Sequence, residues 1–432
     1  MARLLDPAKF TPQFAWRGNR VFCENVPLDK IAAKFGTPSY VYSRAAIENA
    51  YRNLDRALSS AFRSTPRTIC YAVKANPNLS ILKLLARLGS GFDIVSGGEL
   101  DRLRRIGVRG DRIVFSGVGK TREEIREALR ARIRLFNVES AAELELLAEE
   151  ASRARFAAPA SLRVNPDVAA GAHPHIATGT RQHKFGVDWP QALKLYRAHR
   201  DSKWISWQGI SAHIGSQIVT LRPYASEVRK LAQYVKDLRT AGINLRYVDA
   251  GGGLGVRYTS EEPPDFAAFG RALAKELRPL NCHVLIEPGR ALVALAGVLL
   301  MSVLYTKQTR GKTFVIVDAA MNDFMRPALY SAVHPITRAT RGDRAAATRE
   351  SHLTTVAIAG PVCETGDVFL NSWPLPEVAA GDSLILWGAG AYGFTQSSNY
   401  NSRLRPAEIL VEGARARVIR RRESRTDMLR AE

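Results

Sequence analysis

A lysine lies at the end of the first strongly apolar run of the chain, in Tyr-Ala-Val-Lys74-Ala-Asn-Pro-Asn. Apolar residues flank Lys74, and we expect burial to lower its pKa toward the neutral amine, which is the nucleophilic form. Such an amine could form a Schiff base with an aldehyde cofactor. The alternative is a lysine that lies along apolar surface and extends its ammonium group to solvent. The residue alone leaves both interpretations open.

Three consecutive glycines, Gly251, Gly252 and Gly253, stand in the run Asp249-Ala-Gly-Gly-Gly-Leu-Gly. Consecutive glycines let backbone N–H groups converge on an anion such as phosphate. A dinucleotide-binding fingerprint would need a glycine where Val256 stands, so that pattern is absent. The run predicts a phosphate site, and a flexible turn is the alternative.

Two further runs contain side chains that suit a pyridine ring and its phosphate. The carboxylate of Glu287, in Glu-Pro-Gly-Arg290, could hold a protonated ring nitrogen, and Arg290 could bind phosphate or carboxylate. His213 could stack on such a ring, with Ser216 near the phosphate. A structural Glu–Arg ion pair and an ordinary core histidine are the alternatives.

The carboxyl-terminal third contains a second group of candidates. Cys363 and Glu364 are adjacent, so a thiol that could donate a proton stands beside a carboxylate that could bind an ammonium group. Arg326 and Tyr330 stand one helical turn apart and suit a carboxylate. A buried apolar cysteine and a turn-capping glutamate are the alternatives.

The elements that must position these residues alternate between short apolar runs and segments of helical period. Ser140 and Thr121 are predicted helix N-caps, the first with a capping box to Glu143. Eight strands alternating with helices predict a (β/α)8 barrel, and a doubly wound open sheet is the alternative. The predicted strands are Thr68–Ala75, Gly91–Ser96, Arg112–Gly117, Arg134–Glu139, Ala160–Asn165, Trp207–Ser216, Arg246–Gly252 and His283–Gly289.

The carboxyl ends of barrel strands meet at one rim, where the active sites of such barrels lie. Polar residues stand at these ends, and we expect Lys74, Asp93, His213 and Glu287 to become neighbours there. This convergence of residues that are distant in sequence is the first functional signal.

After residue 290, strand-like runs follow one another with few helical segments, which predicts a mostly antiparallel β domain. We therefore predict an α/β protein with three parts: an N-terminal segment (1–45) that packs with the β domain, a barrel (46–295) and the β domain (296–432), with 342–351 as an exposed loop. The predicted β-domain strands are Val298–Tyr305, Thr313–Asp318, Thr354–Ile358, Ser383–Trp387, Glu408–Glu412 and Arg415–Arg420.

Composition excludes several classes of protein. The formal net charge of +21 comes from scattered basic residues without interleaved aromatics, so we predict no nucleic-acid partner. No apolar run is long enough to span a membrane, no signal peptide is evident, and we predict a cytoplasmic protein. The four cysteines lack metal-ligand or disulfide spacing. We predict no metal, because His173, His175 and His183 have no cysteine or carboxylate cluster beside them.

Taken in order along nearly the whole chain, these motifs resemble the diaminopimelate decarboxylase family, within the alanine-racemase-like class of pyridoxal enzymes. Each motif alone is weak, whereas the ordered set is specific. The set consists of Tyr-Ala-Val-Lys74-Ala-Asn, Gly91-Phe-Asp-Ile-Val-Ser-Gly-Gly-Glu99, Lys184-Phe-Gly, His213-Ile-Gly-Ser, Gly-Gly-Gly253, Glu287-Pro-Gly-Arg, Cys363-Glu and Gly390-Ala-Tyr-Gly393.

The resemblance implies pyridoxal 5'-phosphate as cofactor and decarboxylation of meso-diaminopimelate to L-lysine as activity. It implies catalytic roles for Lys74 and Cys363, and a homodimer in which Cys363 and Glu364 reach the active site of the second subunit. The residues that it implies around the cofactor are Lys74, Asp93, His213, Ser216, Gly251, Gly252, Gly253, Glu287, Gly289, Arg290 and Tyr392. Those implied around the amino-acid substrate are Arg290, Arg326, Tyr330, Glu364 and Tyr392.

Two other functions are compatible with the motifs. One is a related decarboxylase acting on ornithine, arginine or carboxynorspermidine, which needs only a carboxylate for the distal ammonium group. The second is a catalytically silent homologue, against which the presence of Lys74, Glu287 and Cys363 argues. An amino-acid racemase would not need Glu364 or Arg326.

Overall fold

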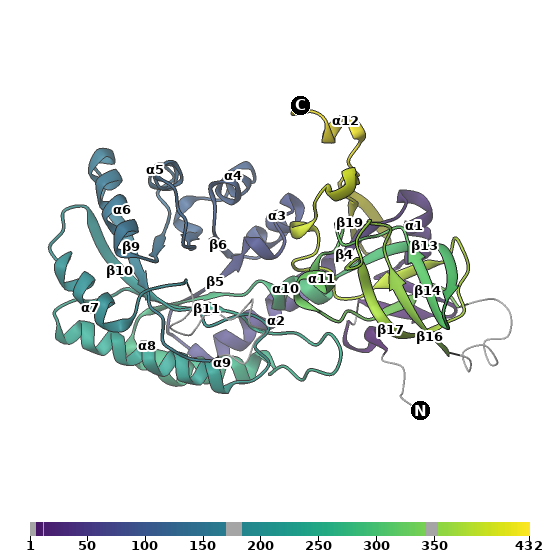
Figure 1. The fold of residues 1–432 in the computed structure, drawn as a ribbon. Helices are drawn as coiled ribbons and strands as arrows, with labels where there is room; N and C mark the ends of the chain where they lie inside the picture. The colour runs from purple at the N-terminus through teal and green to yellow at the C-terminus, as the bar shows by residue number, and fades with distance from the viewer. Residues whose placement is uncertain (1–5, 12, 170–183, 342–352) are drawn as a thin grey trace. The chain divides into compact units, whose positions relative to one another are not determined.

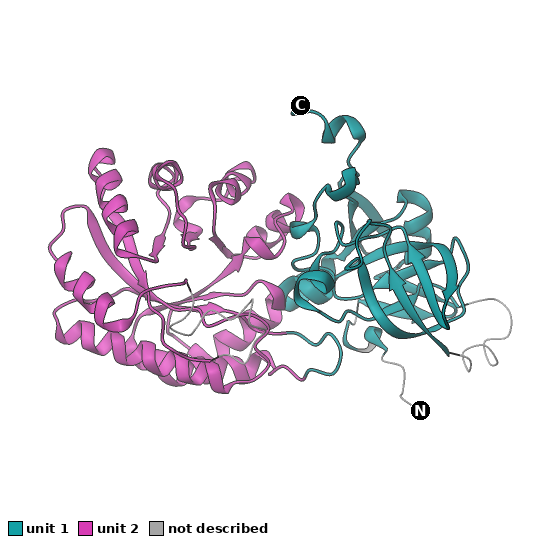
Figure 2. Cartoon of the chain, in the orientation of Figure 1, with its two compact units in different colours: residues 1–50, 256–261, 292–432 teal, residues 51–255, 262–291 magenta. Residues whose placement is uncertain are grey.

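A computed structural model describes residues 6–11, 13–169, 184–341 and 353–432. The chain divides into two compact units (Figure 2), one formed by 51–255 with 262–291 and the other by 1–50, 256–261 and 292–432. The first holds a closed parallel barrel and the second a mostly antiparallel sheet, which confirms the predicted fold class. The domain boundaries at 45 and 295 stay a prediction. The predicted loop 342–351 and the three histidines 173, 175 and 183 lie outside the described residues.

All eight predicted barrel strands are present, and the ring closes where β12 pairs with β5. Every neighbouring pair is parallel, and the strand order around the barrel follows the sequence order. Figure 1 labels β5, β6, β9, β10 and β11 of this barrel, with helices around them. The strands are β5 Arg67–Ala72, β6 Gly91–Ile94, β7 Ile113–Phe115, β8 Leu135–Val138, β9 Ala158–Arg163, β10 Ile205–Ser211, β11 Tyr247–Gly252 and β12 His283–Glu287.

Helices stand between these strands, and their starts differ in one respect from the prediction. Thr121 and Ser140 both cap a helix, but the complete capping box forms between Thr121 and Glu124. The box predicted at Ser140 is wrong, because the Glu143 carboxylate accepts instead from Lys120 and the Glu139 N–H. The helices are α2 Arg44–Phe62, α3 Leu79–Arg87, α4 Gly97–Arg105, α5 Arg122–Arg130, α6 Ala141–Ala154, α7 Trp189–Ala198, α8 Arg222–Thr240, α9 Phe266–Leu277 and α10 Arg290–Val293.

The second unit is built on one sheet of order β17-β16-β14-β13-β4-β19-β20, with β15 and β18 pairing off this path. All six predicted strands occur, and β4, from the N-terminal segment, lies between β13 and β19. The elements are β1 Phe14–Arg17, β2 Arg20–Cys23, β3 Val26–Pro27, α1 Leu28–Phe35, β4 Ser39–Ser43, β13 Gly297–Thr309, β14 Lys312–Val317, α11 Arg326–Tyr330, β15 Ile336–Arg338, β16 Leu353–Ala359, β17 Val368–Pro376, β18 Ser383–Leu386, β19 Ala407–Glu412, β20 Arg415–Arg420 and α12 Arg425–Met428.

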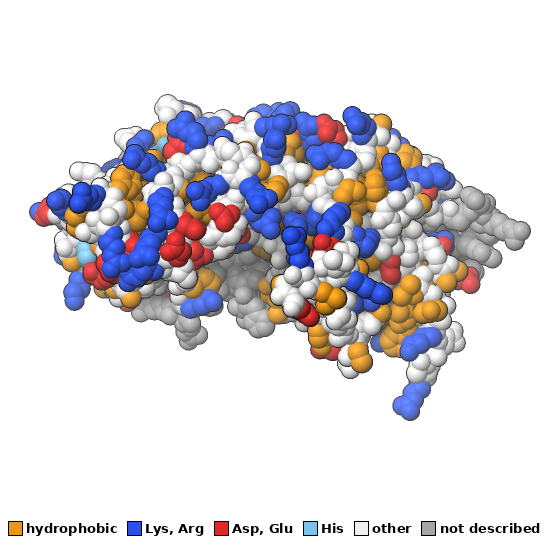
Figure 3. All heavy atoms as spheres, turned by 90° about the horizontal axis from the view of Figure 1, so that it is seen from above, with side chains coloured by type: hydrophobic (Ala, Val, Ile, Leu, Met, Phe, Trp, Pro, Cys, Tyr) orange, Lys and Arg blue, Asp and Glu red, His pale blue; other side chains and the backbone are white. Residues whose placement is uncertain are grey.

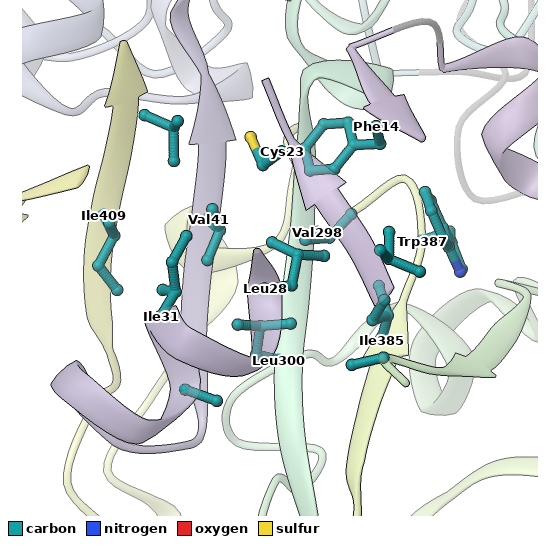
Figure 4. Close-up of a cluster of buried hydrophobic side chains, with 14 of the residues drawn as sticks. Phe14, Cys23, Leu28, Ile31, Val41, Val298, Leu300, Ile385, Trp387 and Ile409 are labelled. Atoms are coloured by element: carbon teal, nitrogen blue, oxygen red, sulfur yellow. The ribbon is translucent and has the colours of Figure 1, made fainter. Parts of the chain in front are cut away.

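A hydrophobic cluster joins the N-terminal segment to this sheet (Figure 4). Phe14 and Leu28 pack with Val298, Leu300 and Trp387, all of them essentially buried. The rings of Phe14 and Trp387 meet edge to face at a centroid distance of 6.0 Å. Because burying one such side chain contributes about 1.5–3 kcal/mol, the segment that begins the chain is a structural part of the β unit.

The distribution of charged residues over the surface and the burial of the cysteines can be read from the structure. Figure 3 shows Lys and Arg side chains among acidic and apolar ones over the face in view. Within the described residues no helix is both long and apolar enough to cross a membrane. Cys23, Cys70 and Cys282 are buried free thiols, and Cys363 is an exposed one.

Candidate active site

Lys74 lies at the carboxyl-end rim of the barrel, in a 3-10 turn (Val73–Ala75) that follows β5 directly. Its Nζ donates to Asp93 Oδ2 at 2.6 Å, and Asp93 at the β6 end is fully buried. The Lys74 side chain keeps 37% of its exposure, so the expected burial is only partial. The turn takes the lysine out of the strand and places it at the rim as an ion-paired, reachable amine.

Asp93 has one carboxylate oxygen to which no described residue donates a hydrogen bond. Its Oδ1 is buried and accepts no hydrogen bond from the residues that the structure describes. A buried carboxylate oxygen without a donor is costly, and native structures rarely leave one so. Beside Lys74, this oxygen favours a ligand that carries a donor to this place.

His213 follows β10 on the same rim and accepts a hydrogen bond from the Gly252 N–H on Nδ1 at 3.1 Å. Burial lowers the pKa of His213 well below its usual value, and the nearby Arg163 and Lys74 cations lower it further. The imidazole is therefore neutral, with its proton on Nε2. A neutral ring held from one edge can present its face to an aromatic ligand.

The predicted role of the glycine run as a phosphate site stays a prediction, and the structure shows what two of its N–H groups bind. The Gly251 N–H donates to Asp249 Oδ1 at 3.0 Å and the Gly252 N–H to His213, so both groups already bind side chains. What requires glycine here is space and conformation: Gly251 and Gly253 have φ of 59° and 90°. A Cβ at Gly252 would lie 2.7 Å from the Glu287 carbonyl carbon. The run therefore lets the backbone pass close to its neighbours.

Arg290 and Ser216 come together as the sequence predicts. The Arg290 side chain is buried and donates from Nη2 to Ser216 Oγ at 3.0 Å. Gly289 lies against Ala72 and Ala75, where a Cβ would be 3.0 Å from that of Ala75. A buried guanidinium beside a hydroxyl is suited to an anionic group such as phosphate.

Glu287 ends β12 inside the rim, where its carboxyl group is hydrogen-bonded to that of Asp249. Burial raises the pKa of Glu287 well above its usual value, and the Asp249 and Asp93 carboxylates raise it further. The Lys74 ammonium acts in the opposite direction but is the weaker influence. Burial and the neighbouring carboxylates thus favour the protonated form of Glu287.

Two buried ion pairs fix the loops around this rim, and neither pairing was predicted from the sequence. Lys120 pairs with Glu143 at 2.7 Å, and Arg163 with Glu139 at 2.7 Å. Glu139 also accepts from the Gly186 N–H, which ties the Lys-Phe-Gly186 motif to the barrel. Glu139 and Arg163 stand at strand ends, which was the available signal for the second pair, but pairing depends on side-chain direction.

The second unit places Arg326 and Tyr330 together on α11. The Arg326 guanidinium lies 5.8 Å from the Tyr330 ring centre and 5.4 Å from that of Tyr258. Its Nε donates to His334 Nε2 at 3.1 Å, and the other nitrogen of His334 is 2.8 Å from the Trp387 carbonyl oxygen. His334 and Tyr258, to which no sequence motif pointed, therefore orient the arginine.

Cys363 and Glu364 are both exposed on the same unit. The Cys363 N–H donates to Asn401 Oδ1 at 3.0 Å, and the Tyr400 hydroxyl donates to a Glu364 carboxylate oxygen. Tyr392 has a left-handed backbone with φ of 55°, which is uncommon for a non-glycine residue and is often found at functional sites. The described part of the chain contains no group of side chains that could hold a metal ion.

The predicted residues thus form two sets, one on each unit. The barrel rim holds Lys74, Asp93, His213, Ser216, the glycines and Glu287 with Arg290, linked by the contacts above. The β unit holds Arg326 and Tyr330 on α11. It also holds Cys363, Glu364 and Tyr392, which lie outside this helix.

The chain is similar to known proteins over most of its length. The family model described as "Pyridoxal-dependent decarboxylase, pyridoxal binding domain" matches residues 44–294. The diaminopimelate decarboxylase of Pseudomonas fluorescens is 47% identical over 420 residues, covering 97% of this chain and 98% of the relative.

Two solved structures of diaminopimelate decarboxylases, each complexed with L-lysine, are similar over most of the chain. The Helicobacter pylori structure is 40% identical with a TM-score of 0.88 and covers 94% of this chain and 98% of its own. The M. jannaschii structure is 36% identical with a TM-score of 0.92 and covers 98% of each chain.

Proposed function

Because the chain belongs to the diaminopimelate decarboxylases, we propose that it removes one carboxylate of meso-diaminopimelate as carbon dioxide and releases L-lysine, the last step of lysine biosynthesis. The observation that carries this proposal is the pairing of Lys74 with Asp93 at the same rim as His213, Glu287 and Arg290. We also propose a cytoplasmic location, which cell fractionation would test.

The barrel rim fits pyridoxal phosphate as cofactor. Asp93 has a buried oxygen that accepts from no described residue, and the glycine run leaves no side chain in the way. Lys74 would hold the aldehyde carbon, His213 the ring face, Glu287 the ring nitrogen, and Arg290 with Ser216 the phosphate. When bound, the cofactor supplies the electron sink that takes up the electron pair left by the departing carbon dioxide.

The residues of this chain then bind the substrate and move protons. Arg326, oriented by His334 and two tyrosine rings, is proposed to bind the distal carboxylate of the substrate. Glu364 is proposed to bind the distal ammonium group, and the Cys363 thiol to return a proton to the α-carbon. A distal end that needs both partners would reject ornithine and lysine, since each lacks the second carboxylate.

We propose a homodimer in which Cys363 and Glu364 complete the active site of the second subunit. The exposure of both side chains on the β unit supports this arrangement. Mixing inactive Lys74→Ala and Cys363→Ala chains after reversible dissociation should restore activity, because mixed dimers contain one intact site. If the mixture stays as inactive as its components under conditions where subunits exchange, the shared site is refuted.

Product analysis tests the proposed reaction. The chain with added pyridoxal phosphate should convert meso-diaminopimelate to lysine and carbon dioxide, and Lys74→Ala should not. Ornithine and lysine, offered at the same concentration, should be turned over far more slowly. Equal turnover of ornithine would favour the related decarboxylases instead, and no turnover of any of these substrates by cofactor-loaded protein would favour a silent homologue.

A further inference from the structure

Asp249 stands one strand away from Glu287 in the barrel wall. β11 and β12 pair in parallel with Asp249 opposite Leu285, and Glu287 follows Leu285 by two residues on the same face. Leu285 belongs to the cluster that fills the barrel interior. Asp249 and Glu287 therefore point inward side by side, Asp249 with no exposure and Glu287 with 9%.

The contacts of the two carboxyl groups differ. They lie within hydrogen-bonding reach of each other, and a bond between two carboxyl oxygens needs one proton. Asp249 also accepts from the Gly251 N–H at 3.0 Å and from Asn137 Nδ2 at 2.9 Å. Glu287 has the Ser116 hydroxyl at 3.4 Å. Two good donors stabilise the ionised form of Asp249, so the shared proton belongs on Glu287.

The other charged and titratable groups around the pair do not reverse this assignment. Asp93 on β6 acts on both carboxyl groups, and Lys74, which follows β5 next to β12, acts on Glu287. Cys70 on β5 and Glu227 on α8 also lie near, and burial raises the pKa of each well above its usual value, so both stay neutral.

Hydrogen bonds hold the side-chain amide of Asn137 in the orientation in which it donates to Asp249. Its amide nitrogen donates to Asp249 and, at 3.1 Å, to Ser116 Oγ, while its carbonyl oxygen accepts from the Ser161 hydroxyl. All of these atoms are buried. The network fixes the amide so that its N–H groups, and not its oxygen, face the carboxylate.

We propose that Asp249 is a positioning residue that sets the protonation of Glu287: the pair shares one proton, with Asp249 the ionised member and Glu287 the proton carrier. This inference rests on the proposed function, because the shared proton would serve the ring nitrogen of the cofactor. Glu287 can give that proton to the nitrogen and become a carboxylate, so that two carboxylates face one N–H cation. The electron sink of the cofactor depends on this protonated nitrogen.

Infrared difference spectroscopy of the chain without cofactor tests the shared proton. At pH 7 the wild type should show a carboxylic-acid carbonyl band that Glu287→Gln lacks. The band should titrate at lower pH in Asp249→Asn, measured against the Asp249→Asn/Glu287→Gln double variant. A unit charge about 5 Å away at an effective dielectric constant of about 20 predicts a downward shift on the order of two pH units.

Ser116→Ala is the matched control, because it removes a neighbour of Glu287 without removing a charge, and its midpoint should stay near that of the wild type. Asn137→Ala is a second variant should Asp249→Asn not fold, and it should shrink the Glu287 band by moving the proton toward Asp249. Absence of the band in the wild type, or equal midpoints in Asp249→Asn and Ser116→Ala, would overturn the inference.

Equilibrium dialysis with pyridoxal phosphate separates this inference from the proposed function. Cofactor binding without a titrating Glu287 band refutes the shared proton and leaves the decarboxylase proposal standing. The expected spectra in a chain that binds no cofactor would support the carboxyl pair and count against the proposed function.

Discussion

The closest backbone approach at the candidate site is between Gly252 and β12, and Gly252→Ala tests it. A Cβ there would lie 2.7 Å from the Glu287 carbonyl carbon, whereas ordinary van der Waals contact begins at 3.4 Å. The Glu287 carbonyl oxygen lies nearer still, so the strand that carries Glu287 would have to move by more than about 0.7 Å, because the obstacle is backbone and cannot rotate away. Overpacking in a close-packed core costs about 1–3 kcal/mol, and we expect the upper end of this range here.

Urea denaturation of the cofactor-free chain measures this loss, and equilibrium dialysis measures binding of pyridoxal phosphate. Because Gly252 also donates to His213, affinity should fall by about tenfold or more, which corresponds to about 1.4 kcal/mol. Gly119→Ala is the matched control: it lies on the same unit with nothing within 4 Å of its Cβ position. Its stability should change by less than about 0.5 kcal/mol. Equal stability and equal affinity in the two variants would refute the close approach.

Two further predictions concern groups around the barrel. Lys120→Met leaves Glu143 buried without its partner and should lower the free energy of unfolding by about 3–5 kcal/mol. The double variant Lys120→Met/Glu143→Leu should recover most of this loss, and equal losses in the two variants would contradict the prediction. Burial, with Arg134 and Arg246 nearby, lowers the pKa of His283 from 6.5 to about 4, so the folded chain binds fewer protons than the unfolded chain between these values. Stability is therefore lost as pH falls through this window, and His283→Gln should flatten the slope of unfolding free energy against pH there, whereas an unchanged slope would argue against it.

The barrel could be predicted from the sequence because each of its strands is a short apolar run bounded by polar residues or glycine. The convergence of Lys74, Asp93, His213 and Glu287 followed from the rule that parallel strands end at one rim. β17 was missed because it contains Pro374 and Pro376, which argue against a strand; it lies at the edge of its sheet, where proline is tolerated.

Details of the site depended on geometry that residue types do not encode. The short turn after β5 exposes Lys74, and the bulge between Asp249 and Gly252 directs two glycine N–H groups to side chains. Asp249 itself was visible in the motif, but its contact with Glu287 requires the register of two strands. His334 gave no sequence signal, because a lone histidine in an irregular segment has no pattern.

The attachment point of the cofactor is the most direct test of the role of Lys74. The chain should be incubated with pyridoxal phosphate, reduced with borohydride, digested and analysed by mass spectrometry, with Lys74→Ala treated in parallel. We predict the phosphopyridoxyl mass on the peptide that contains Lys74, and its loss in the variant. A phosphopyridoxyl group on another lysine such as Lys120, or no modified peptide from protein that has bound the cofactor, would contradict the account.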